Sequence, residues 1–182
     1  MYRDNSLMPK EAVRLAALGI LRLNGPQAYA ELAAAVRHFT SRVVGPSLDL
    51  MGTSLEMLRL EGLIASGNET TDKSALLFLT ESGAVAFETL MRASVRSPST
   101  DELNKLVITL KLRFLHLLDC EAQREQVDGL ISLYETELAR LTDLEHHYAE
   151  EAGYLGAWLE QDIAHTRKNL AWFRDLYNRL AV

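Results

Sequence analysis

The stretch Ser47–Gly83, SLDLMGTSLEMLRLEGLIASGNETTDKSALLFLTESG, decides the fold of this chain. The apolar residues of its first part recur three or four positions apart: Leu48, Met51, Leu55 and Leu58. That spacing gathers apolar side chains on one face of a helix. Ser47 is a typical N-cap residue, and Gly62 follows the apolar run where helices commonly stop. The pattern therefore predicts one helix that is bounded at both ends.

A two-stranded hairpin is expected directly after this helix. Two short apolar runs, 63–65 and 75–79, flank the polar turn residues 67–72, and a new helix opens at the sequence LTESG, which ends at Gly83. Helix, hairpin and helix in this order form the layout of a winged helix-turn-helix, whose recognition helix lies in the major groove of DNA. The stretch thus predicts a DNA-binding module.

The residues before and after the stretch supply further helices. The periodicity of the apolar residues predicts helices at 9–23, 27–39 and 82–92. Residues 40–47, TSRVVGPS, are expected to form a connection between two helices. The first of these helices is apolar on nearly every side, so we expect it to be covered on more than one face. Ser97-Pro98-Ser99-Thr100 is typical of a linker. We therefore expect two domains, a winged helix-turn-helix DNA-binding domain at 1–96 and a helical dimerisation domain at 97–182.

The C-terminal part shows no strand signal. One helix is predicted at 101–118, and two longer heptad helices are predicted at 121–150 and after Gly153. The short break between the long helices predicts an antiparallel hairpin. The expected fold class is therefore mainly α with a small β-hairpin wing, a winged helix-turn-helix plus a C-terminal antiparallel helical hairpin.

We expect the chain to form a homodimer. The two heptad seams make an apolar stripe that we judge too long for one hairpin to cover alone. The residues assigned to dimerisation are Leu110, Phe114, Leu159, Ile163, Leu170, Phe173 and Tyr177.

Composition narrows the class of protein. The chain has 182 residues, of which 48% are hydrophobic, but it has no run of about 18 apolar residues and no apolar N-terminal leader. We therefore expect a soluble cytoplasmic protein. Residues 1–100 carry ten basic and ten acidic side chains, whereas residues 101–182 carry nine against fifteen, so the formal net charge of −6 belongs to the C-terminal part. The N-terminal part retains enough basic residues to contact nucleic acid.

In order and spacing, several motifs resemble those of the PadR family of bacterial transcriptional regulators. They are LAALGILRLNGPQAY at 15–29, SLDLMGTSLEMLRLEGLI at 47–64, LTESG at 79–83, and the tail segments LKLRFLHLL and NLAWFRDLYNRL. The resemblance spans nearly the whole chain. It implies a winged-helix DNA-binding regulator with a helical dimerisation tail, whose partners are double-stranded DNA, a second copy of itself and a small aromatic effector.

The recognition helix departs from the family pattern. That pattern is close to Ser-Pro-Gly-Thr-Leu-Tyr-Pro-Ala-Leu followed by basic residues, whereas this chain has Leu48 and Asp49 where Pro and Gly are expected, Gly52 in place of the Tyr, and Glu56 near a basic position. Reading of guanine by a bidentate Arg or Lys therefore has few side chains to use. The residues assigned to DNA contact are Arg37, Arg42, Ser47, Asp49, Thr53, Arg59 and Lys73, and the alternative is that they are ordinary solvated surface.

Aromatic residues gather on the last helix. Core packing explains them, and the alternative is an apolar pocket in which Tyr154, Trp158 and Trp172 bind the effector that the resemblance implies. Nothing in the sequence names such a ligand.

No arrangement of residues predicts catalysis, a cofactor or a metal site. His146 and His147 lack metal-ligand spacing, and a solvated helix face explains them better. Cys120, the single cysteine, is expected to be a buried structural thiol, and Glu137 is expected on a solvated face.

Two functions remain open at this point. The first is a dimeric transcriptional regulator, a repressor that blocks promoter access. The second is a degenerate winged-helix protein that acts as a protein-interaction or ligand-sensing module without sequence-specific DNA binding, which the acidic recognition helix favours.

Overall fold

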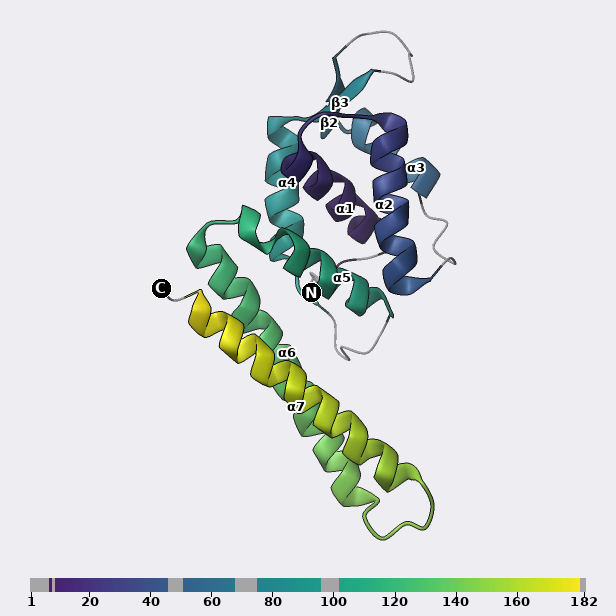
Figure 1. Cartoon of the computed structure of the whole chain (residues 1–182), viewed down its shortest axis with the longest axis vertical. Helices are drawn as coiled ribbons and strands as arrows, with labels where there is room; N and C mark the ends of the chain where they lie inside the picture. Colours follow the sequence, from purple (N-terminus) through teal and green to yellow (C-terminus); the bar gives the residue numbers. More distant parts are fainter. Residues whose placement is uncertain (1–6, 8, 46–50, 68–74, 96–101, 181–182) are drawn as a thin grey trace, which may run out of the picture. The chain divides into compact units, whose positions relative to one another are not determined.

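A computed structural model describes residues 7, 9–45, 51–67, 75–95 and 102–180, and it divides the chain into two compact units. The first unit holds α1 (Pro9–Asn24), β1 (Gln27–Ala28), α2 (Tyr29–Val44), α3 (Met51–Leu60), β2 (Ile64–Ser66), β3 (Leu76–Leu79), α4 (Glu81–Arg92), α5 (Glu102–Phe114) and the 3₁₀ turn η1 (Leu115–Leu117). The second unit holds α6 (Cys120–His147) and α7 (Leu155–Arg179). The predicted fold class, mainly α with a β wing and a C-terminal helical hairpin, is confirmed (Figure 1).

Helix α1 is the centre of the first unit. It packs against α2, α3, α4, α5 and β3, and its apolar residues from Ala12 to Leu21 are almost completely buried. A helix that is apolar on every side needs this many neighbours, because its surface would otherwise face water. The expectation that several elements cover this helix is confirmed.

The wing strands belong to a three-stranded antiparallel sheet in the order β1-β3-β2. The prediction of a helix from Gln27 was wrong, because Gln27 and Ala28 pair with Leu77 and Leu76 as the third strand. Helix α2 also runs to Val44, so the prediction that residues 40–44 form a connection was wrong. The four-residue step of Leu32, Val36, Thr40 and Val44 keeps the same face buried through that segment.

Helix α5 packs inside the first unit, on α1 and α2. The ring of Phe114 lies edge-on to Phe87 of α4, at 6.0 Å between centroids. The guanidinium of Arg113 lies 4.6 Å from the centroid of Phe39 on α2, and burial lowers its pKa. The predicted boundary at 96/97 grouped this segment with the C-terminal helices, whereas these contacts join it to the winged module.

In the second unit, α6 and α7 pack along their heptad seams. Leu141, Leu159 and Ile163 form one buried cluster, and the ring of Tyr134 lies 5.1 Å from that of Phe173. Glu137 interrupts the seam. Its carboxylate is fully buried and accepts hydrogen bonds from Arg140, one of them 2.6 Å long, so the expectation of a solvated Glu137 was wrong. None of the helices in the described ranges is long and apolar enough to cross a membrane.

Candidate nucleic-acid interface

The core-facing side of α3 is set by two leucines. Leu55 and Leu58 are three residues apart and fully buried, and α3 packs on α1 and α2. The intervening and following side chains are exposed: Glu56, Met57, Arg59 and Leu60. The described half of α3 therefore presents one cation, one carboxylate and two apolar side chains to solvent.

The end of α3 is fixed by contacts to its neighbours. The guanidinium of Arg14 on α1 pairs with the carboxylate of Glu61, the residue that follows α3. The hydroxyl of Thr80 donates to the carbonyl of Gly62, at 2.7 Å, and accepts from the amide of Gly83 at the start of α4, at 3.0 Å. Gly83 has no room for a side chain, because a Cβ there would lie 2.0 Å from the carbonyl oxygen of Leu63. These contacts hold α3, the wing base and α4 in one arrangement.

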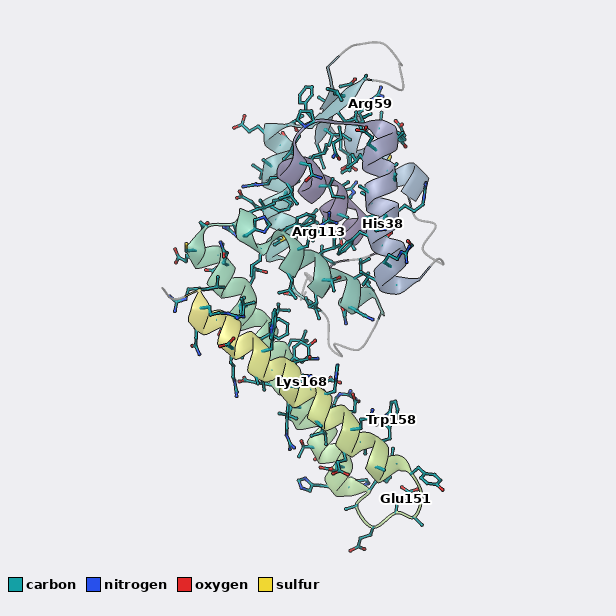
Figure 2. The ribbon with its side chains drawn as sticks, viewed as in Figure 1. His38, Arg59, Arg113, Glu151, Trp158 and Lys168 are labelled. Atoms are coloured by element: carbon teal, nitrogen blue, oxygen red, sulfur yellow. The ribbon has the colours of Figure 1, made fainter. Side chains whose placement is uncertain are left out.

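Three predicted phosphate contacts can be placed. Arg37 and Arg42 are exposed on α2, and Arg59 is exposed near the end of α3, beside the strands (Figure 2). Within the described ranges, no ion pair joins any of these guanidinium groups to another residue. No described interaction links the three to one another.

Four predicted DNA contacts cannot be placed. Ser47, Asp49 and Lys73 lie outside the described residues. Thr53 lies within α3, but its side chain is outside the described part.

The three predicted effector-binding residues do not surround one small ligand. Tyr154, at 92% exposure, precedes α7, while Trp158 and Trp172 lie on α7 at 65% and 46% exposure. The two tryptophans are 14 positions apart in one helix, which places them about 21 Å apart along its axis. A shallow hollow of about 370 Å³ includes Trp158, together with Asp162, His165 and Lys168 on the same helix.

The residues assigned to dimerisation are covered within the chain itself. Leu110 and Phe114 are fully buried in α5, and Leu159, Ile163, Leu170 and Phe173 are buried along α7. Tyr177 is half-buried, and the guanidinium of Arg124 on α6 lies 4.9 Å from its ring centroid.

The thiol of Cys120 lies at one end of α6, and His146 and His147 lie at the other. The expectation of a buried thiol was wrong, because Cys120 is exposed in the first turn of α6. His146 and His147 are exposed at the other end of α6. Within the described ranges, no group of three His, Cys, Asp or Glu side chains is arranged to hold a metal ion.

A family model identifies the class of protein. The model described as "Putative AphA-like transcriptional regulator" matches residues 2–177. The chain therefore belongs to the AphA-like family of transcriptional regulators, which confirms the prediction of a transcriptional regulator. Among curated proteins, none matches this sequence.

Several solved structures are similar to this chain. Bacillus subtilis PadR in complex with operator DNA is 16% identical, with a TM-score of 0.39, over 92% of this chain and 98% of that one. The same protein in complex with p-coumaric acid is 16% identical, with a TM-score of 0.38, over 97% and 99% of the two chains. The protein smu.1604c from Streptococcus mutans UA159 is 19% identical, with a TM-score of 0.39, over 92% and 95%.

Proposed function

We propose that this protein is a DNA-binding transcriptional regulator that acts as a homodimer and represses by blocking promoter access. One observation carries the proposal. The chain belongs to a family of transcriptional regulators, and Arg59 is exposed on α3, the proposed recognition helix. Among the described residues, no ion pair joins its guanidinium to a carboxylate. Guanidinium groups in such positions contact phosphates, which fix the register of a protein on the duplex.

The test uses duplex DNA from the region upstream of the protein's own gene. Affinity is measured by fluorescence anisotropy over about 50 to 200 mM salt, because phosphate contacts make log K fall linearly with log salt. We expect a steep negative slope. Absence of binding at the lowest salt would contradict the proposal.

Arg59→Ala should weaken binding to every DNA sequence by a similar factor and reduce the salt slope by about one, because one phosphate contact is lost. Arg167→Ala is the matched control, since it removes the same charge from an exposed position on α7 in the other unit. Loss of discrimination at one base pair, with an unchanged salt slope, would instead make Arg59 a base reader.

A second function is favoured by the apolar side chains of α3. Leu60 is 80% exposed and Met57 is 44% exposed, on the same helix as the exposed carboxylate of Glu56. DNA phosphates repel the carboxylate of Glu56, and they provide no favourable contact for the apolar side chains of Met57 and Leu60. A protein partner, in contrast, can bury these apolar side chains. A winged-helix module that binds a protein in place of DNA therefore stays the alternative, and the low-salt binding assay separates the two.

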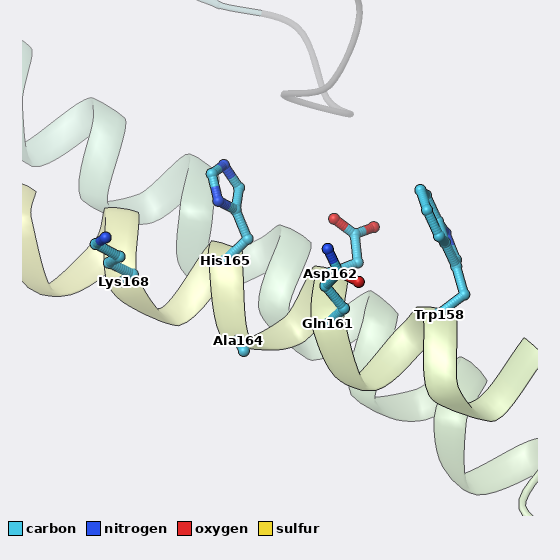
Figure 3. A pocket seen from close by; sticks show the side chains of 6 residues that line it. All are labelled: Trp158, Gln161, Asp162, Ala164, His165 and Lys168. Carbon is cyan, nitrogen blue, oxygen red and sulfur yellow. The ribbon is translucent and has the colours of Figure 1, made fainter.

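Assembly and effector are parts of the same proposal. Light scattering should give twice the chain mass of 20.4 kDa, and a mass of one chain would contradict the homodimer. Release by a small aromatic effector is a further part of the proposal, and its candidate site is the hollow of about 370 Å³ at Trp158 (Figure 3), which does not include Trp172. An aromatic acid that lowers DNA affinity in the same assay would support this part.

A further inference from the structure

An ion pair between α1 and the end of α3 joins two residues that are 47 positions apart in the sequence. The guanidinium of Arg14 pairs with the carboxylate of Glu61, the residue that directly follows α3. The amide of Glu61 donates to the carbonyl of Met57, at 2.9 Å, so Glu61 still belongs to the last helical turn. Arg59, the proposed phosphate contact, lies in the same turn. Arg14 therefore holds the part of α3 on which the proposed DNA contact depends.

The surroundings of this ion pair favour a directed contact. The side chains of Arg14 and Glu61 are 26% and 35% exposed, so the protein covers most of each. Partial burial reduces the screening of the two charges by salt. Glu61 also lies at the C-terminal end of a helix, where the helix dipole disfavours a carboxylate that has no cation beside it. The guanidinium of Arg14 supplies that cation.

Apolar packing by itself restricts the orientation of α3 only weakly. The helix has ten residues, and among its described side chains the buried ones are Leu55 and Leu58. Hydrophobic contact is non-directional, so these leucines keep the helix on the core but leave rotation about its own axis less restricted. A guanidinium donates in fixed directions, which makes its pairing with a carboxylate directional. The ion pair at the end of the helix therefore selects one orientation.

A second contact holds the backbone that follows the helix. The hydroxyl oxygen of Thr80, the N-cap residue of α4, lies 2.7 Å from the carbonyl oxygen of Gly62 and 3.0 Å from that of Leu63. Thr80 thus fixes the turn toward the wing, whereas Arg14 fixes a side chain in the last turn of α3 relative to α1. The orientation of α3 relative to α1 is the part that depends on Arg14.

We propose that Arg14 is a positioning residue for DNA binding, which acts through Glu61 to set the orientation in which α3 presents Arg59. The inference rests on the proposed DNA-binding function and adds a residue that itself does not contact the duplex. The ion pair adds little to the stability of the folded chain, as is usual for partly exposed pairs. Its role is to favour one orientation of α3 among several that differ little in energy.

The sign of the effect of Glu61→Gln distinguishes positioning from simple electrostatics. DNA is a polyanion, so removal of a carboxylate near the duplex ordinarily strengthens binding. The proposal predicts the opposite sign, because Glu61→Gln breaks the pair with Arg14. The Kd for DNA should rise about fivefold for each α3 on the duplex, the factor that corresponds to one such ion pair. Arg14→Gln should have a similar effect, and the double variant should bind about as weakly as either single variant, since both remove the same interaction.

Glu56→Gln is the matched control. It makes the same chemical change on the same helix, at an exposed carboxylate that forms no ion pair with another described residue. Loss of this negative charge should strengthen DNA binding slightly. Opposite signs for Glu56→Gln and Glu61→Gln therefore support the proposed role of the ion pair.

The salt dependence distinguishes positioning from direct contact. A phosphate contact made by Arg14 itself would be lost in Arg14→Gln, and the slope of log K against log salt would fall by about one. A positioning residue changes the population of the binding orientation, while the duplex still binds that same orientation. The slope of Arg14→Gln should therefore stay close to the native slope.

Charge exchange provides a rescue. Arg14→Glu with Glu61→Arg rebuilds the ion pair in reverse and should recover most of the affinity that Arg14→Glu alone loses. All affinities are measured at a temperature at which circular dichroism shows each variant to be folded, so a change in global stability does not enter the comparison.

The possible outcomes separate this inference from the proposed function. Stronger binding by Glu61→Gln, a slope that falls by about one in Arg14→Gln, additive losses in the double variant, or no recovery on charge exchange would each overturn the positioning role while leaving DNA binding in place. A native chain that fails to bind DNA at the lowest salt would overturn both.

Discussion

Phe114→Ala is expected to lower the free energy of unfolding of the first unit by about 3–5 kcal/mol, the usual cost of deleting a buried aromatic ring. The ring is fully buried at the end of α5 and meets Phe87 of α4 edge-on. It also covers Gly19 of α1, where a Cβ would lie 2.4 Å from the ring. The variant removes the side chain that holds α5 on the winged module, and the cavity adds to the cost.

The effect of Gly19→Ala on the free energy of unfolding should have opposite signs in the native chain and in the Phe114→Ala background. In the native chain the added methyl overlaps the Phe114 ring, so the variant should lower stability. In the Phe114→Ala background the ring is gone, and alanine should raise stability by about 1 kcal/mol, since it is the better helix former. An equal cost in both backgrounds would show that the ring does not exclude the methyl group.

Urea unfolding followed by circular dichroism measures these changes. Both tryptophans lie on α7, so their fluorescence reports on the second unit and provides an internal reference. We expect the fluorescence transition to move less than the circular dichroism transition. Equal shifts of the two signals would indicate that the units unfold together.

Most of the helices could be predicted from local sequence patterns, because the buried face of a helix is determined by residues that are close together in the chain. The heptads of α6 and α7 and the apolar faces of α1 and α3 are set by residues three and four positions apart. Strand β1 was missed because Gln27 and Ala28 have no strand pattern, and their pairing with β3 depends on residues about fifty positions away. The grouping of α5 was missed for the same reason. Gly19 gives room to Phe114, and no local rule relates two positions so distant in the chain.

The candidate site was predicted only in part. The exposure of Arg37, Arg42 and Arg59 follows from their positions beside buried residues in helices, but the proposed contact of these residues with DNA does not follow from the helical pattern. Glu137 was assigned to a solvated face because charged side chains are usually exposed. However, Glu137 lies three positions after Tyr134, which itself lies four positions after Leu130, and this spacing places Glu137 in the buried seam. The period was the better guide than the residue type. Cys120 shows the reverse error, since thiols are often buried but the first turn of α6 is open.

Buried Lys111 is expected to make the stability of the first unit depend strongly on pH. Its ammonium is almost fully buried on α5 and donates to the carbonyl of Met91, in the last turn of α4. Burial lowers the pKa of Lys111 from 10.5 to about 8. The hydrogen bond to a helix carbonyl favours the charged form, but it does not offset the loss of hydration.

The sign follows from proton binding. Between pH 8 and 10.5 the unfolded chain holds the Lys111 proton more tightly than the folded chain does, so stability rises with pH through this window. The contribution from pH 7 to about 9.5 is about 2 kcal/mol. It is measured as the difference between the native chain and Lys111→Met, because the other lysines and the tyrosines titrate equally in both. A difference that stays constant over this range would show that Lys111 keeps its ordinary pKa and that water reaches its ammonium group.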